Sequence, residues 1–253
     1  MAFGSAFDPG EKVVSRMLAR EGVVVVCVDF RNSEIPSSTN EHIAPFPGGL
    51  NDCYSGLLWC SEHCLELGVD SKRIIVAGVS GGGNLCIATV LKAKKMGTLG
   101  IISGFYALCP YIAGSWPNNV INEGILGDSH IKNKAFSVLG GTREMSNMAM
   151  GYCADAFRAR DALAWPGFAT VDDLHGLPRC VISVNECDPL RDEGVNFYRR
   201  LLQAGVPARC VDKIGTTHGG DLGVAAVPEI ALATIRDITD FAKQVGCGFV
   251  AKL

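Results

Sequence analysis

The chain has 253 residues, of which 48% are hydrophobic and 19% are charged, and its formal net charge is -3 at pH 7. This length and composition fit one large α/β domain or two small ones with a sizeable core. The charge balance and the lack of a basic stripe argue against a nucleic-acid partner, and no apolar run reaches the ~18 residues of a membrane span.

The amino-terminal residues and the cysteines bear on the compartment. The first five residues have neither the basic start nor the apolar core of a secretion signal, so we expect a cytoplasmic protein. The eleven cysteines are then expected to be reduced and mostly buried. Cys53, Cys60 and Cys64 share a helical face near His63, but core packing is favoured over a zinc site because paired C-x-x-C spacings are absent.

Apolar runs predict alternating strands and helices along the chain. Helices are expected from Asp8–Pro9 to Gly22, over 48–67, over 192–204 and over 228–245, and strands over 23–28, 73–78, 101–108, 179–184 and 208–214. The unbroken β-branched run at 23–28 is typical of a strand buried on both faces. This order predicts an α/β fold with a mostly parallel sheet and helices on both faces.

Residues 110–168 differ from this framework. They are rich in Asn, Gly, Met and aromatic residues, and they predict short helical pieces without a strand. We expect the core to comprise 1–109 and 169–253, with 110–168 forming a small helical lid over one end of the sheet. Candidate liners of a pocket beneath it are Trp116, Ile121, Ile125, Leu126 and Phe136.

The most informative stretch runs from Ile74 to Asn84. It reads as a strand, then G-x-S-x-G around Ser80, then a helix. A serine on such a tight turn has a strained backbone and an exposed hydroxyl, as a nucleophile requires. The alternative is a glycine-rich turn that binds phosphate, although the Lys of a P-loop is missing.

A serine nucleophile needs a base and an acid that orients the base. His218 follows the last predicted strand among glycines, where a histidine has no packing role, although it could also be an exposed loop residue. Asp188 follows the strand before it and precedes Pro189, so it is the favoured acid. Glu186 is the alternative acid, and Asp188 could instead only cap a helix.

These segments together resemble the hormone-sensitive-lipase-like (bacterial type IV) esterases of the α/β-hydrolase fold. The similar stretches are VVVCVDFR at 24–31, PFPGGLND at 45–52, GVSGGGN at 78–84, DPLRDEG at 188–194 and His218-Gly219. The resemblance implies a serine carboxylesterase for short to medium acyl chains, with Ser80, Asp188 and His218 as triad, the Gly81 amide in the oxyanion hole, and neither cofactor nor metal.

One family feature is missing. The H-G-G-G motif, which supplies further oxyanion amides, should come just before Met1, and the strand leading into it should lie between the strands at 23–28 and 73–78. We therefore expect either an amino-terminally truncated chain, which is favoured, or a rearranged sheet in which these two strands pair directly. The expected partner is a small-molecule ester, and the sequence leaves open a homodimer, a non-catalytic ligand-binding protein and a structural partner chain.

Overall fold

The computed structural model describes residues 5–37, 41–116 and 125–245. Its centre is a four-stranded parallel sheet in the order β1-β2-β3-β4. The strands are β1 (Ile75–Val79), β2 (Gly104–Leu108), β3 (Cys180–Asn185) and β4 (Ala208–Lys213). Register pairs join Val76 to Phe105 and Ile182 to Cys210. The α/β fold with a parallel sheet, predicted from the sequence, is confirmed.

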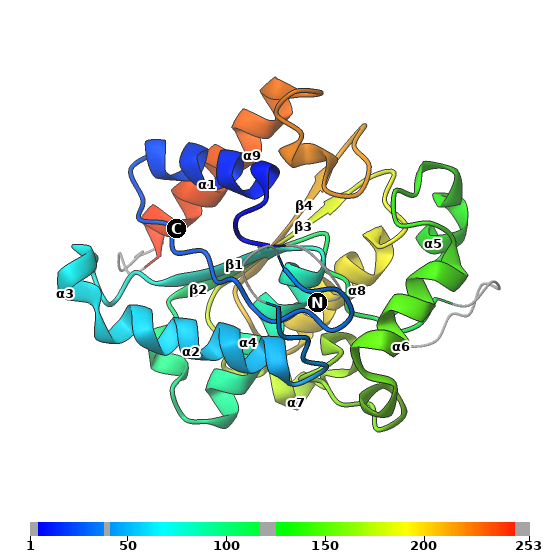
Figure 1. The fold of residues 1–253 in the computed structure, drawn as a ribbon, viewed down its shortest axis with the longest axis horizontal. Helices are drawn as coiled ribbons and strands as arrows, with labels where there is room; N and C mark the ends of the chain where they lie inside the picture. Colours follow the sequence, from blue (N-terminus) through cyan, green and yellow to red (C-terminus); the bar gives the residue numbers. More distant parts are fainter. Residues whose placement is uncertain (1–4, 38–40, 117–124, 246–253) are drawn as a thin grey trace.

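Helices cover both faces of the sheet (Figure 1). The longer helices are α1 (Pro9–Arg20), α2 (Gly48–Glu62), α4 (Gly81–Lys95), α6 (Thr142–Arg158), α8 (Arg191–Gln203) and α9 (Pro228–Gln244). Short helices α3 (Cys64–Leu67), α5 (Ser129–Lys132) and α7 (Val171–Leu174) join them. α1 and α9 cover one face, and α2, α4 and α8 the other (Figure 1). Pro9 and Pro228 open α1 and α9, since the first helical position needs no amide donor.

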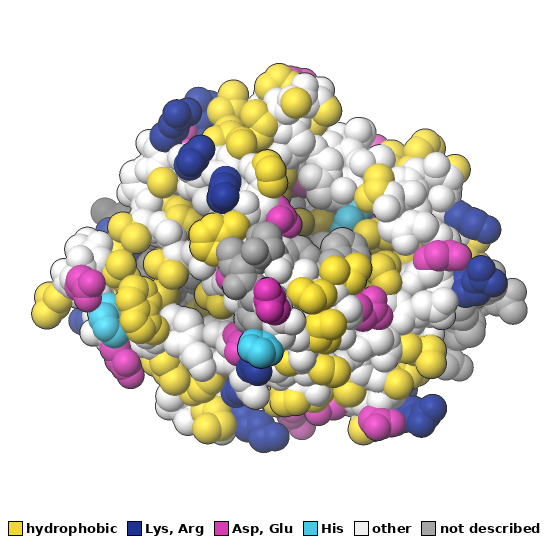
Figure 2. Space-filling model, viewed as in Figure 1, with side chains coloured by type: hydrophobic (Ala, Val, Ile, Leu, Met, Phe, Trp, Pro, Cys, Tyr) yellow, Lys and Arg dark blue, Asp and Glu magenta, His cyan; other side chains and the backbone are white. Residues whose placement is uncertain are grey.

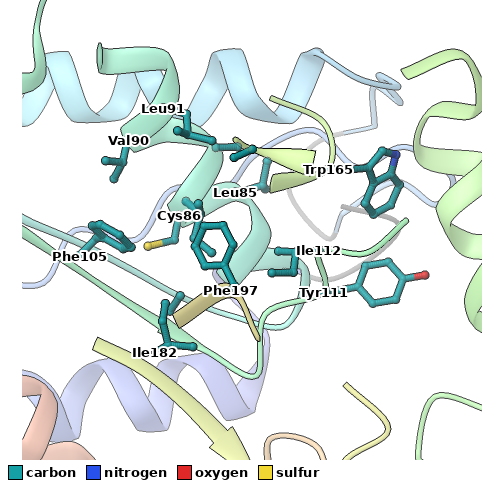
Figure 3. Packing of buried hydrophobic residues seen from close by; sticks show 14 of the residues in the cluster. Leu85, Cys86, Val90, Leu91, Phe105, Tyr111, Ile112, Trp165, Ile182 and Phe197 are labelled. Carbon is teal, nitrogen blue, oxygen red and sulfur yellow. The ribbon is translucent and has the colours of Figure 1, made fainter. Parts of the chain in front are cut away.

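The core is densest around α4 and the two middle strands. Every residue of β2 and β3 is buried. Ten of the fifteen residues of α4 are buried too, because the helix is apolar on most sides and lies between the sheet and α2. Figure 3 shows Leu85, Cys86 and Val90 of α4 packed toward Phe105, Ile182 and Phe197.

The predicted strand at 23–28 is wrong. These residues are extended but belong to no sheet, and the side chains of Val24 and Val26 are 53% and 41% exposed. β1 is an edge strand of the described sheet, and its outer edge is not paired with this segment. Direct pairing of this segment with β1 does not occur either. The segment is held instead by side-chain contacts such as Ser15 Oγ to Cys27 Sγ at 3.1 Å.

The helix predicted over 48–67 breaks at His63 into α2 and α3. Leu50 and Leu57 are buried as their spacing predicts, whereas Leu65 is 98% exposed. The region 110–168 is helical, and its described residues contain no strand. Its longest helix, α6, spans 17 residues but is interrupted at Cys153, whose φ of -169° and ψ of 99° are not helical, so it consists of two shorter pieces.

Candidate active site

Ser80 stands on a strained turn between β1 and α4. Its φ is 56° and its ψ is -117°, a backbone conformation that residues other than glycine rarely adopt. The turn is tight because its glycines leave no Cβ in the way. A Cβ on Gly78 would lie 2.1 Å from the Gly82 carbonyl oxygen, and one on Gly83 would lie 2.9 Å from the Leu108 carbonyl oxygen. The sequence thus permits the close approach that strains and presents the serine.

Backbone hydrogen bonds fix this turn against the end of β2. The Ser80 amide donates to the Leu108 carbonyl at 2.9 Å, and the Tyr111 amide donates to the Ser80 carbonyl at 3.2 Å. The Asn84 side chain adds a buried bond from Nδ2 to the Tyr111 carbonyl at 2.9 Å. The position of the serine is therefore set by the core of the sheet.

The structure brings Ser80, His218 and Asp188 together in one line of hydrogen bonds. His218 Nε2 lies 2.8 Å from Ser80 Oγ, and His218 Nδ1 lies 2.8 Å from Asp188 Oδ2. Asp188 is fully buried, and the His218 side chain is 7% exposed. A buried carboxylate next to Nδ1 favours the tautomer with a proton on Nδ1, which leaves the Nε2 lone pair facing the serine hydroxyl.

The two candidate acids occupy different places in the loop after β3. Asp188 faces His218, and its Oδ1 accepts a hydrogen bond from the Leu190 amide at 2.9 Å. Glu186 points elsewhere, and its Oε2 accepts from the Gly215 amide at 2.8 Å. The geometry thus favours Asp188 over Glu186 as partner of the imidazole.

The environment of His218 raises its pKa well above the usual 6.5. Burial disfavours the imidazolium and works in the opposite direction, but the interactions of the ring with Cys109 and with the Asp188 carboxylate outweigh it. The ring therefore binds a proton readily, which suits a group that must take one from a hydroxyl.

Comparison with known proteins adds to this geometry. A model of the α/β-hydrolase fold matches residues 2–221. The structure of esterase Est22 is 46% identical, with a TM-score of 0.87, over 96% of this chain and 68% of that one. Brefeldin A esterase, described as a bacterial homologue of human hormone-sensitive lipase, is 39% identical with a TM-score of 0.86, over 95% of this chain and 65% of that one.

The chain belongs to the hormone-sensitive-lipase-like esterase family of the α/β-hydrolase fold. Carboxylesterase NlhH of Mycobacterium tuberculosis is a more distant relative, 29% identical over 217 residues that make up 85% of this chain and 62% of that protein. The chain thus spans about three fifths of the length of the curated relatives it matches. In the described part of the chain, no helix combines the length and the apolar character needed to cross a bilayer.

Gly81, which the family resemblance predicts to contribute to the oxyanion hole, is the first residue of α4. Amides in the first turn of a helix have no partner within the helix, and they lie at its positive end. The Gly81 amide follows Ser80 directly, so it is available to a negative charge that forms beside the serine hydroxyl.

The candidate lid residues divide into core and surface. Trp116 and Ile125 are buried, and the Trp116 Nε1–H donates to Glu193 Oε2 at 2.6 Å. Leu126 is half-buried against the core, and Phe136 is 53% exposed. Ile121 lies outside the described residues. Trp116 therefore joins the region 110–168 to α8, a contact that its sequence position did not reveal.

The cysteine cluster weighed as a metal site does not assemble. Cys64 Sγ, in α3, donates to the Cys60 carbonyl, in α2, and His63 Nδ1 lies 2.8 Å from the Trp59 carbonyl oxygen. The ten cysteines among the described residues are all free. The described residues do contain another group with metal-ligand chemistry, formed by Cys109, Asp188 and His218.

Sequence reasoning missed the residues that hold the triad loops. Asn185 ends β3, and its Nδ2 donates to Thr216 Oγ1 at 2.7 Å and to Asp221 Oδ1 at 2.9 Å, which joins the acid loop to the histidine loop. Asn133, from the lid, donates to the Glu186 and Asp188 carbonyls at 2.8 and 2.9 Å. A polar residue that ends an otherwise apolar strand was a signal for Asn185, whereas Asn133 had none.

Proposed function

We propose that this chain is a serine carboxylesterase that hydrolyses esters of short to medium acyl chains through an acyl-enzyme. The observation that carries the proposal is the line of two 2.8 Å contacts from Ser80 through His218 to Asp188. Nucleophile, base and orienting acid are all present, and all three stand at the carboxyl ends of parallel strands, where sites of α/β proteins gather.

In the first half of the reaction, Ser80 Oγ attacks the ester carbonyl carbon while its proton passes to His218 Nε2. Asp188 keeps the other proton on Nδ1 and stabilises the imidazolium that forms. The carbonyl oxygen becomes an oxyanion beside the Gly81 amide. His218 then gives its proton to the leaving alcohol, and the acyl group remains on Ser80.

In the second half, water attacks the acyl-enzyme while His218 Nε2 takes its proton. The same oxyanion contact stabilises the second tetrahedral intermediate, and the carboxylic acid leaves when the proton returns to Ser80 Oγ. These steps use only residues of this chain and water.

We propose in addition that residues 110–168 form a lid over the active site. Its support is the position of Asn133, which binds the carbonyls of Glu186 and Asp188 and so places lid residues directly over the acid loop. An apolar cover at this end of the sheet would exclude water from the acyl group. We expect kcat/KM to fall when p-nitrophenyl butyrate is replaced by p-nitrophenyl palmitate.

A fluorophosphonate probe tests the proposed nucleophile directly. It labels a serine only when a base activates the hydroxyl, so we expect one labelled peptide, containing Ser80. Ser80→Ala should abolish labelling, whereas Ser71→Ala, at an exposed turn serine, should leave it unchanged. A folded protein that binds p-nitrophenyl esters but is neither labelled nor active would overturn the proposal in favour of a ligand-binding protein.

A further inference from the structure

Cys109 is a thiol at the triad that the proposed reaction does not use. It directly follows β2 and is 1% exposed. One ligand atom each from Cys109, Asp188 and His218 lie within 4.8 Å of one another. His218 Nδ1 faces Asp188 at 2.8 Å, and Nε2 faces Ser80 Oγ at 2.8 Å, so Nδ1 is the nitrogen that shares its surroundings with the carboxylate.

The backbone holds Cys109 in this place at a cost. Its φ is 33°, in the left-handed region that residues other than glycine rarely adopt. The Cys109 amide donates to the Ser183 carbonyl of β3 at 2.7 Å, and the preceding Leu108 carbonyl accepts from the Ser80 amide. The thiol is therefore fixed to the same two strands and the same turn that position the triad.

Sulfur, imidazole nitrogen and carboxylate oxygen are the three ligand types that bind zinc. Bonds of about 2.0–2.3 Å to such ligands place the ligand atoms roughly 3–4 Å apart around the ion. The three ligand atoms lie within 4.8 Å of one another, so small movements suffice, including a slight opening of the 2.8 Å contact between His218 Nδ1 and Asp188 Oδ2. Three protein ligands leave a fourth position open for water. The sodium, magnesium and calcium ions, which prefer oxygen ligands, fit this set poorly.

We propose that Cys109, Asp188 and His218 form an inhibitory site for a thiophilic divalent cation of the zinc type. The thiol loses its proton to solvent and binds as thiolate, and the ion takes the lone pair of His218 Nδ1. The proton on Nδ1 moves to Nε2, so that Nε2 donates to Ser80 Oγ and can no longer accept its proton. The inhibition rests on the proposed esterase reaction, whereas binding of the ion does not.

Two measurements separate binding from inhibition. Co²⁺ serves as the spectroscopic probe, since a cysteine thiolate bound to it gives a charge-transfer band in the near ultraviolet. Zn²⁺ serves as the inhibitor, with p-nitrophenyl butyrate hydrolysis as the readout and a chelator to reverse the effect. The variants are Cys109→Ser and Cys109→Ala, and the matched control is Cys60→Ser on α2.

We expect wild type and Cys60→Ser to bind one Co²⁺ with the thiolate band and to lose activity reversibly in Zn²⁺. Both Cys109 variants should lack the band, and each should need at least ~10-fold more Zn²⁺ for half inhibition, measured against its own metal-free activity. Equal Zn²⁺ sensitivity of wild type and either folded Cys109 variant would overturn the proposal, as would a Co²⁺ band that persists without Cys109. If the metal-free chain hydrolyses no ester, the proposed function fails, and the Co²⁺ band alone then decides the site.

Discussion

The two sides of the sheet differ in how completely they are packed and hydrogen-bonded. On the side of β2 and β3, every strand residue is buried, and the loops beyond them are joined by Asn185, Asp188 and Asn133. On the side of β1, the strand is only partly buried, and the extended segment 23–28 leaves Val24 and Val26 exposed. The candidate active site draws on both sides, because Ser80 follows β1 whereas Asp188 follows β3.

This difference shows that the triad geometry does not depend on the sheet being equally ordered throughout. The face seen in Figure 2 carries hydrophobic patches among small separate groups of Lys and Arg. The exposed large hydrophobic residues include Val13, Val24, Val26 and Trp59 of the amino-terminal part. Changes near β3 should therefore affect activity and stability strongly, whereas changes near 23–28 should affect them weakly.

The largest expected effect comes from the acid. Asp188→Asn should lower kcat about 10⁴-fold, because an amide at this place favours the wrong tautomer of His218. Glu186→Gln is the matched control, two residues away in the same loop, and should change kcat by less than ~10-fold because Glu186 contacts Gly215 and not the imidazole. Steady-state kinetics with p-nitrophenyl butyrate measure both. A larger loss in the Glu186 variant would reverse the assignment of the acid.

The pH profile follows from the raised pKa of His218. His218 must be neutral to accept the serine proton, so kcat/KM should fall about tenfold per pH unit below a midpoint that lies above 6.5. The unfolding free energy changes in the opposite sense. The imidazolium–Asp188 pair contributes fully to it below pH 6.5, and this contribution is lost as the pH rises through the pKa of His218 in the folded protein.

The residual activity of Asp188→Asn should show a pH profile whose midpoint lies lower than that of the wild type. A midpoint at or below 6.5 in the wild type would contradict the raised pKa of His218.

Glu193 tests how much the densely packed side of the sheet, around β2 and β3, contributes to stability, because it is not a triad residue. Its buried carboxyl group accepts hydrogen bonds from the Ile112 and Ala113 amides at 2.7 and 3.2 Å and from Trp116 Nε1. Burial raises its pKa to about 8. Glu193→Ala should cost roughly 3 kcal/mol of unfolding free energy, since buried donors lose their acceptor.

The pH dependence of the unfolding free energy shows whether the Glu193 carboxyl group titrates in the folded protein or only fills space in the core. The folded state holds the Glu193 proton up to about pH 8, whereas the unfolded chain releases it near 4.5. The unfolding free energy contributed by this group therefore decreases as pH rises from about 4.5 to about 8. Glu193→Gln removes the titration and should flatten the profile in that window, as measured by urea unfolding. An unchanged slope would show that Glu193 is ionised in the folded protein.

The sequence predicted the strands of the sheet and the Ser80 turn better than the segment 23–28, for a physical reason. Buried strands 104–108 and 180–185 and the glycine-flanked Ser80 are local signals, because apolar runs and Cβ-free turns depend little on distant partners. Pairing is not local: Val23 to Val28 has the composition of a buried strand, yet no ladder forms in the described structure. Cys109 and Asn133 were missed because their contacts join segments far apart in the chain.

The smallest effect should come from the exposed segment, and it completes the comparison. Val24→Ala removes two methyl groups from a side chain that is 53% exposed, whereas Val184→Ala removes the same groups from a fully buried position on β3. Deleting buried methyl groups costs their transfer free energy and leaves a cavity, so Val184→Ala should lower the unfolding free energy by about 2 kcal/mol. Val24→Ala should change it by less than ~0.5 kcal/mol, because the side chain gives up little buried area. Urea unfolding of both variants beside the wild type measures the pair under one condition. A cost at Val24 as large as that at Val184 would mean that residues 23–28 are packed against a partner that shields them from water, and the contrast between the two sides of the sheet would no longer hold.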